Sequence, residues 1–514
     1  MTGRPAARFA AFAGVLALLG AAVLAALDRA PDHRGGVSAP VRSSPPAAAA
    51  TLRWTPCGTA QCSTLTVPLD WSGRDPKAAG HTVPIAVLRL PATGPRSQRI
   101  GSLLVNPGGP GESGVAFVRD HADVLPAEVR ARFDIVGFDP RGVGLSMPVH
   151  CLTDTQLDAQ DQLPPYPANP GEQRQLVRAA QTEALACAKA LGPALGYLAT
   201  ADVARDLDAL RAGLGEQRLS YLGYSYGTAI GAAYAQAYPT RIRALVLDGA
   251  LDPAQTAVGM LRAQAGGFEA ALSAFAGWCA RNGQCSFGAH LANPAAVLAG
   301  YDRLAAAVRA VPLAVGARQL GSGEFTLGVL ITLYSKEQGW PALGYALARA
   351  ASGDGSVLLR LADAYVERDA AGHHSNLSEA NLAVNCLDRP WPRQVQDYAA
   401  LATELARTDP RFGRTIAWSG LGCLSWAAAP VTVPHPVRAS SSPPILVVGT
   451  TRDPATPYAQ ARSLAGQLDH GVLLTVDGDG HTAYRATGNP CVVKTVDAYL
   501  LDLNAPSRAV GARC

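Results

Sequence analysis

A serine between two glycines, within residues 219–228, has the setting that points most directly to chemistry. An apolar run leads into Gly223, Ser225 and Gly227, and residues 229–238 then have the composition of a helix. A strand, a tight turn and a helix in this order form a G-x-S-x-G nucleophile elbow. The turn strains the serine backbone, so the positions two residues either side must lack side chains. Ser225 is therefore the predicted nucleophile, although the motif alone would also fit an ordinary turn serine.

Two further residues supply the partners that such a serine needs. A hydroxyl becomes a good nucleophile when an imidazole accepts its proton, and a carboxylate must fix the tautomer of that imidazole. Asp453 and His481 each follow a late apolar run that is typical of a buried strand. The order Ser, Asp, His is the order of the α/β-hydrolases. The sequence thus predicts the triad Ser225, Asp453 and His481, with Asp248, which follows an earlier strand, as the alternative acid.

A glycine-rich segment, residues 106–114, follows the strand-like run 101–105. An oxyanion hole needs backbone N–H groups near the nucleophile, on a loop without obstructing side chains. We expect the N–H groups of Tyr226 and Gly109 to form this hole. A loop without a catalytic role is the alternative.

The elements that must position these residues follow an α/β pattern. Strand-like runs alternate with helical periodicity, which predicts a mostly parallel sheet flanked by helices. We expect residues 51–252 to form the first part of an α/β-hydrolase core and residues 441–514 its C-terminal part. Between them, residues 253–440 are predicted to be a large, mainly helical cap inserted before the last strands and long enough to roof a site. The strand-like runs of the core are 63–69, 83–90, 101–105, 133–138, 242–247, 444–449 and 472–476.

The amino terminus and the cysteines point to export. Arg4 and Arg8 precede an uncharged run, so residues 1–27 are predicted to be a signal peptide or a retained membrane anchor. Residues 28–50 have the composition of a flexible linker. Ten cysteines favour an oxidising compartment, so we expect a secreted, extracellular or cell-envelope protein. The simplest disulfide framework, among many that the sequence allows, pairs neighbours in order: Cys57–Cys62, Cys151–Cys187, Cys279–Cys285, Cys386–Cys423 and Cys491–Cys514.

Composition narrows the functions further. In the 514 residues, 48% are hydrophobic and 16% charged, as in a globular protein, and the net charge of +4 gives no reason to expect a nucleic-acid partner. The cysteines lack the spacing of a zinc site, and His373 and His374 lie in a polar stretch, so no metal or cofactor is predicted. Asp139 and Arg141 are interpreted as structural residues of a turn.

Five motifs together resemble the secreted actinobacterial tripeptidyl aminopeptidases, which belong to the prolyl-iminopeptidase-like serine peptidases of the α/β-hydrolase fold. The resemblance extends from about Trp54 to Cys514 and implies the release of short peptides, often tripeptides, from free N-termini through an acyl-enzyme at Ser225. Pro107 stands where prolyl iminopeptidases usually carry histidine, so simple removal of proline is not favoured. The motifs are residues 106–111, 139–142, 223–227, 452–457 and 478–482.

An enzyme of this kind would take peptide or protein N-termini as substrate and must bind their ammonium group. Buried carboxylates of the cap could do so through charge-assisted hydrogen bonds, and Glu269 and Asp388 are the candidates. Thr456, close behind Asp453, is expected to orient the acid or the histidine. Two alternatives remain: an esterase or lipase with the same triad and the cap as lid, or a non-enzymatic binding protein. The oligomeric state is left open.

Overall fold

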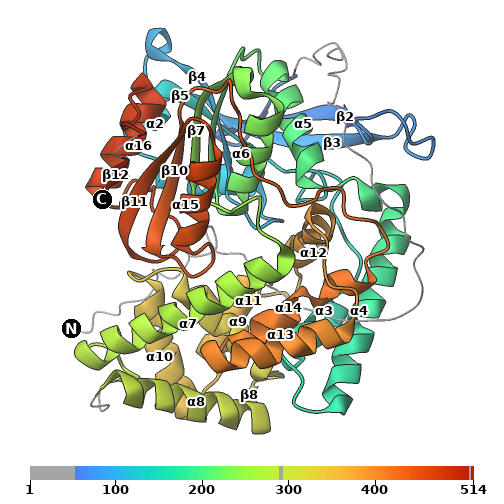
Figure 1. Cartoon of the computed structure of the whole chain (residues 1–514), viewed down its shortest axis with the longest axis vertical. Coiled ribbons are helices and arrows are strands. Elements are labelled where there is room, and N and C mark those ends of the chain that lie inside the picture. The colour runs from blue at the N-terminus through green and yellow to red at the C-terminus, as the bar shows by residue number, and fades with distance from the viewer. Residues whose placement is uncertain (1–51, 289–292, 509–510) are drawn as a thin grey trace.

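The computed structural model describes residues 52–288, 293–508 and 511–514, so the predicted signal or anchor and the linker lie outside the described residues. Figure 1 shows two layers: a sheet flanked by helices in the upper half of the view, and a helical layer below it. The carboxyl end of the chain lies at the edge of the sheet, at β12.

Ten strands form one sheet in the order β1-β2-β3-β5-β4-β6-β7-β10-β11-β12. The strands from β5 to β12 in this order run parallel, whereas β1, β2, β3 and β5 pair antiparallel. The predicted α/β-hydrolase sheet is therefore confirmed. The strands are β1 Thr55–Cys57, β2 Ala60–Pro68, β3 Thr82–Leu90, β4 Gly101–Asn106, β5 Phe133–Phe138, β6 Leu219–Tyr224, β7 Ile242–Asp248, β10 Ile445–Arg452, β11 Gly471–Asp479 and β12 Ala512–Arg513.

Alternate residues of the central strands supply two separate apolar cores, one on each face of the sheet. Leu104, Tyr221 and Val447 pack on one face, and Leu103 and Leu222 pack on the other. This alternation follows from the two-residue period of a strand. The first face is covered by α5 Thr200–Gly213, α6 Tyr226–Ala237 and α15 Tyr458–Gln467, and the second by α1 Gly114–His121, α2 Ala127–Arg132 and α16 Pro490–Asp502.

The helical layer has an apolar core of its own. Most of its helices come from residues 253–440, but α3 and α4 come from the chain before the elbow and pack in the same layer (Figure 1). Leu176 and Cys187 of α4 belong to the same buried cluster as Phe268 and Trp418. We propose to count this earlier segment with the cap. The helices are α3 Asp154–Asp161, α4 Pro170–Leu191, α7 Ala257–Arg281, α8 Pro294–Ala310, α9 Ser322–Leu333, α10 Gly339–Ala351, α11 Ser356–Tyr365, α12 Leu377–Asp388, α13 Val395–Thr408 and α14 Gly413–Ser419, with a small ribbon of β8 Leu313–Val315 and β9 Arg318–Leu320.

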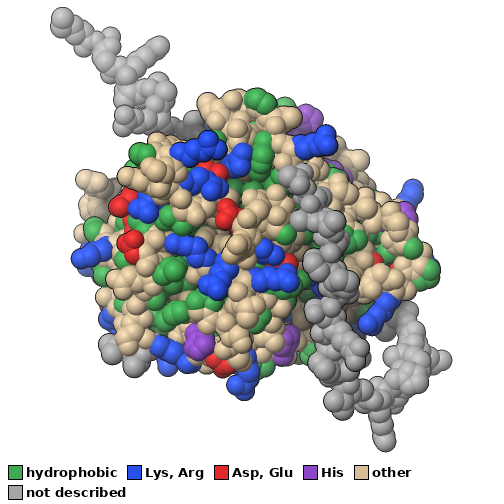
Figure 2. Space-filling model, turned by 90° about the horizontal axis from the view of Figure 1, so that it is seen from above, with side chains coloured by type: hydrophobic (Ala, Val, Ile, Leu, Met, Phe, Trp, Pro, Cys, Tyr) green, Lys and Arg blue, Asp and Glu red, His purple; other side chains and the backbone are tan. Residues whose placement is uncertain are grey.

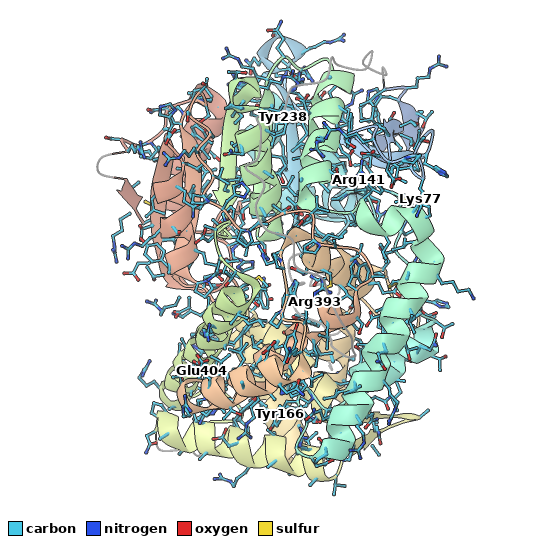
Figure 3. The ribbon with its side chains drawn as sticks, turned by 45° about the vertical axis from the view of Figure 1, so that its right-hand side comes forward. Lys77, Arg141, Tyr166, Tyr238, Arg393 and Glu404 are labelled. Atoms are coloured by element: carbon cyan, nitrogen blue, oxygen red, sulfur yellow. A yellow bond between two sulfur atoms is a disulfide. The ribbon has the colours of Figure 1, made fainter. Side chains whose placement is uncertain are left out.

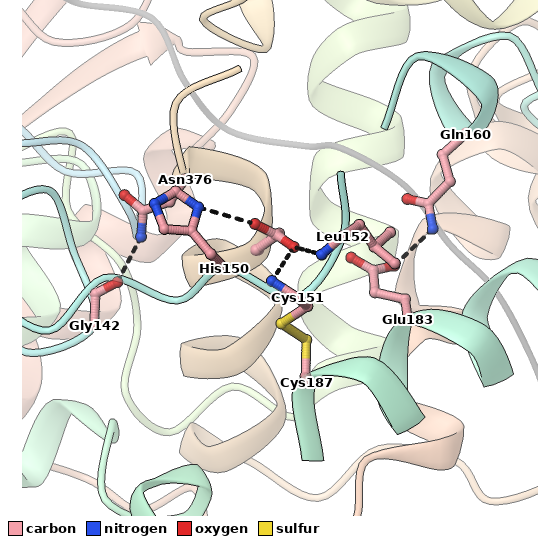
Figure 4. Close-up of a disulfide and its surroundings, with 9 residues drawn as sticks. Gly142, His150, Cys151, Leu152, Gln160, Glu183, Cys187 and Asn376 are labelled. Atoms are coloured by element: carbon pink, nitrogen blue, oxygen red, sulfur yellow. Dashed lines mark hydrogen bonds and ion pairs between the residues drawn. A yellow bond between two sulfur atoms is a disulfide. The ribbon is translucent and has the colours of Figure 1, made fainter. Parts of the chain in front are cut away.

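Five disulfides join the cysteine pairs that the sequence order predicted. Three of them lie in the helical layer. Figure 4 shows Cys151–Cys187, which ties the loop before α3 to α4. The bond from Cys491 to Cys514 fixes the last residue against α16.

Arg141 and Asp139 are buried braces of the sheet half, as interpreted from the sequence. Arg141 forms two hydrogen bonds to Asp206 at 2.6 and 2.7 Å and others to carbonyl groups of the chain. It lies beside α5, whereas Tyr166 and Glu404 lie in the helical layer (Figure 3). Asp139 accepts hydrogen bonds from Ser113 and from the N–H of Leu145. Both residues therefore fix loops rather than face a ligand.

The surface gives no single charged patch on the face seen from above. Lys and Arg side chains are spread among apolar and polar ones there (Figure 2).

Within the described ranges, no single helix is long and apolar enough to cross a membrane. One bent pair of helical segments, 170–196 with 200–213, has the length and composition of a membrane span, and those two properties are its only support.

Candidate active site

The backbone at Ser225 has the strained conformation that the motif predicted. Its φ is 51° and ψ is −122°, between the end of β6 and the start of α6. A Cβ added at Gly223 would lie 2.4 Å from the carbonyl oxygen of Gly227, and one at Gly227 would lie 2.8 Å from the carbonyl oxygen of Asn106. Only glycine fits at either position, so strand and helix can pass closely and leave the serine at the apex.

The glycine-rich loop lies directly against this elbow. A Cβ at Gly108, where φ is +120°, would lie 2.9 Å from Cβ of Ser225 and 3.2 Å from the backbone nitrogen of Tyr226. Tyr226 begins α6, so its N–H has no carbonyl acceptor within the helix. Gly109 lines the same pocket as Ser225. The structure thus brings the two predicted oxyanion residues to the nucleophile.

The predicted acid and base are joined by hydrogen bonds. Nδ1 of His481 lies 2.9 and 2.8 Å from the two carboxylate oxygens of Asp453. Asp453 also accepts hydrogen bonds from the N–H groups of Ala455 and Thr456 and from Oγ1 of Thr456. Oγ1 of Thr456 lies 3.3 Å from the same imidazole nitrogen. Thr456 is therefore placed to fix the carboxylate against the ring.

Asp248, the alternative acid, contacts a different part of the site. It accepts hydrogen bonds from the N–H groups of Ala483 and Tyr484, in the loop that follows His481. Burial raises its pKa to about 6 despite these bonds. Asp248 supports the histidine loop, and Asp453 is the carboxylate that contacts the imidazole.

Ser225 and His481 face a small pocket that Tyr334 of the helical layer also lines. The volume of the pocket is about 40 Å³, and its walls include Pro107, Gly109 and Glu112. Oγ of Ser225 and Nε2 of His481 are both buried and have no hydrogen-bond partner in the described part of the chain. Buried polar atoms are normally paired, and a catalytic role is one of the reasons for an exception. A serine and an imidazole arranged in this way can transfer a proton when a substrate carbonyl enters.

The cap contacts the histidine loop through Tyr334, which sequence reasoning missed. The carbonyl of Tyr334 accepts the N–H of His481 at 2.8 Å, and the two rings meet edge to face at 5.3 Å. Lys336 binds Asp479 at 2.6 Å, two residues before the histidine. No local pattern marks Tyr334, because its role depends on how the cap docks.

The two acids predicted to bind the ammonium group lie elsewhere. Glu269 on α7 binds the side chain of Arg411 at 2.7 Å and the backbone N–H of the same residue. Asp388, at the end of α12, accepts hydrogen bonds from the N–H and Oγ1 of Thr200. Neither acid is among the residues that line the pocket at Ser225. Glu112 does line it, and the only sequence signal for this residue was its place within the glycine-rich loop.

Serine hydrolases of the α/β-hydrolase fold carry nucleophile, acid and base behind separate strands in this chain order. Here Ser225, Asp453 and His481 follow β6, β10 and β11. Residues 101–310 match the family described as alpha/beta hydrolase fold, and residues 409–514 match the one described as TAP-like protein.

Three curated relatives cover nearly the whole chain. The serine protease Hip1 of Mycobacterium tuberculosis is 37% identical, with 92% of each chain covered. Carboxylesterase B of the same organism is 36% identical over 89% of this chain and 86% of the relative. Tripeptidyl aminopeptidase of Streptomyces lividans is 31% identical over 93% of this chain and 89% of the relative. The chain belongs to this family of α/β-fold serine hydrolases. Among solved structures, esterase E22 matches with a TM-score of 0.33 at 15% identity, covering 86% of this chain and 98% of that chain.

Proposed function

We propose that the protein is a secreted serine aminopeptidase that releases short peptides, mainly tripeptides, from free N-termini. The observation that carries the proposal is the Asp453–His481 pair, whose imidazole lines the same pocket as the strained Ser225. The similarity to a tripeptidyl aminopeptidase along 93% of the chain supports a peptide as substrate.

In the proposed reaction, Oγ of Ser225 attacks the scissile carbonyl carbon while its proton passes to Nε2 of His481. Asp453 stabilises the imidazolium through Nδ1. The N–H groups of Tyr226 and Gly109 bind the oxyanion. Collapse of the tetrahedral intermediate breaks the C–N bond, and the imidazolium donates its proton to the leaving amine. A water molecule, deprotonated by His481, then hydrolyses the acyl-enzyme.

The proposed location is the cell exterior or envelope. Residues 1–27 supply an export signal or anchor in this proposal. The five disulfides support an oxidising compartment. Export of the full chain but not of a chain lacking residues 1–27, measured in culture medium and membrane fractions, would test it.

A carboxylesterase is the second candidate, because a relative with that name is almost as similar as Hip1. The same triad would attack an ester, and the helical layer would act as a lid over the acyl group. The two candidates differ in whether a free amine in the substrate matters.

Chromogenic peptides that release one, two or three residues, each with a free and an acetylated N-terminus, would test the proposal. We expect turnover to be concentrated on free-amine tripeptides and to be lost in Ser225→Ala. Equal turnover of acetylated peptides, or activity on esters alone, would reject the aminopeptidase and favour the esterase.

A further inference from the structure

A second, much larger cavity adjoins the pocket at Ser225. Its volume is about 1480 Å³, whereas the pocket at the serine has about 40 Å³. On this measure about 10–15 Å³ already holds one water molecule, so the smaller space has room for only a few. Ligand sites usually need about 300 Å³ or more. A peptide bound at Ser225 must therefore extend into the larger cavity.

The two spaces meet at a short stretch of the glycine-rich loop and α1. The residues that border both are Pro107, Glu112 and Phe117. Among these, Glu112 carries the carboxylate, and it is only 7% exposed. A chain whose carbonyl lies at Ser225 can therefore reach this carboxylate as it enters the larger cavity.

The backbone on either side of Glu112 is held in place. A Cβ added at Gly111 would lie 2.5 Å from the carbonyl oxygen of Leu377, so the loop abuts the start of α12. On the other side, Ser113 caps α1 and donates a hydrogen bond to Asp139 at 2.6 Å. The carboxylate is thus presented from a fixed loop, the same one that carries Gly109.

The other acids along the larger cavity do not border the pocket at Ser225. They are Asp120, Asp363, Glu367 and Asp369. Burial is the main cause of the raised pKa of Tyr334, which lines the pocket, and the charge of Glu112 adds to it.

We propose that the carboxylate of Glu112 binds the α-ammonium group of the peptide substrate and so selects free N-termini. The inference rests on the proposed aminopeptidase function. An ammonium group that leaves water for a buried site needs a paired negative charge. Glu112 supplies this charge at the junction through which the fragment must pass, which Glu269 and Asp388 do not.

The test compares Glu112→Gln with the wild type on one tripeptide p-nitroanilide, with its N-terminus free or acetylated, and on p-nitrophenyl acetate. The variant keeps the side-chain volume and loses the charge. A charge-assisted hydrogen bond accounts for roughly a 10- to 100-fold effect, so kcat/KM for the free amine should fall by about that factor. Turnover of the acetylated peptide and of the ester should stay near wild type, which also shows that the variant folds.

Two further variants sharpen the result. Glu112→Asp, which keeps the charge, should retain most of the preference for the free amine. Glu269→Gln makes the same chemical change outside the pocket and should leave the ratio of free to acetylated turnover at the wild-type value.

The failures can be told apart. If the wild type showed no preference for free amines, the aminopeptidase function and this assignment would both be rejected. A wild-type preference that persists in Glu112→Gln, or an equal loss on all three substrates, would overturn the role of Glu112 alone.

Discussion

The buried carboxylate at the end of β10 and the one on α4 near the Cys151–Cys187 disulfide differ in the number of hydrogen-bond donors that contact them. Asp453 accepts two backbone N–H groups, the hydroxyl of Thr456 and the imidazole of His481. Glu183 on α4 accepts one amide hydrogen bond, from Gln160 (Figure 4). Burial and the neighbouring charge of Glu379 raise the pKa of Glu183 to about 8.

Asp248 lies between Asp453 and Glu183 in the number of its hydrogen-bond donors. It accepts backbone N–H groups of two residues, and its pKa is raised to about 6, chiefly by burial. Hydrogen bonds to a carboxylate favour its charged form, whereas burial opposes it. In Asp248 and Glu183 alike, hydrogen bonds oppose the effect of burial, and the pKa rises less where the backbone N–H groups of two residues donate than where one amide does.

The largest expected effect comes from Asp453→Asn, which removes the charge that the imidazole contacts. The amide also favours the wrong tautomer of His481, so kcat/KM should fall by about 10⁴-fold. Steady-state kinetics on the substrate that the wild type prefers would measure it. A loss below tenfold would show that another acid serves His481.

Asp206→Asn tests a buried acid whose partner is a permanent cation. It leaves the guanidinium of Arg141, which is fully buried, without its charge partner. Breaking such a pair should lower the free energy of unfolding by about 3–5 kcal/mol. Urea unfolding would measure it, with Asp208→Asn on the same helix as the more exposed control. Similar losses in both variants would contradict the special cost of the buried pair.

Glu183→Gln tests the acid that has the fewest hydrogen-bond donors of the three compared above. Its pKa is raised from 4.5 to about 8, so the neutral form stabilises the fold fully below about pH 4.5. That contribution is lost as pH rises through about 8. Between pH 6 and 8 the wild type should lose about 1 kcal/mol per pH unit relative to the variant. Thermal unfolding of both proteins across this range would measure the difference, and parallel curves would contradict the assignment.

The smallest effect is expected from Asp248→Asn. The amide oxygen can still accept the N–H groups of Ala483 and Tyr484, and no contact with the imidazole is lost. Activity should stay within about tenfold of the wild type, in the range of one ordinary hydrogen bond. Kinetics measured beside Asp453→Asn would give the contrast between the two strand ends directly.

Sequence patterns predicted the sheet and placed the three candidate residues after its strands because both inferences depend on short-range rules. The expected strand at 133–138 coincides with β5, and the one at 242–247 ends one residue short of β7. The helix after the elbow, expected from residue 229, begins at Tyr226, because the positive φ of Ser225 turns the chain straight into it. That difference matters, since it makes the N–H of Tyr226 a helix-terminal donor.

The cap was harder to interpret from its residues. Glu269 and Asp388 are the predicted buried acids of the cap, but their partners, Arg411 and Thr200, are 142 and 188 residues away in the chain. Likewise, the sequence does not predict α4 in the helical layer, because the apolar face of α4 acquires a partner only when it packs against the short helical turn Gly420–Ser425. Such pairings depend on docking between distant segments.

By itself, the sequence determined the α/β order of the core, the strained elbow at Ser225 and the order of serine, acid and histidine. These are properties of backbone sterics and of short stretches of chain. Only the tertiary structure decided that Asp453 rather than Asp248 contacts His481, that Tyr334 closes over the histidine loop, and that Glu112 stands where two cavities meet. Those outcomes depend on which distant surfaces come together, because a side chain acquires its partners and its burial only when the layers pack.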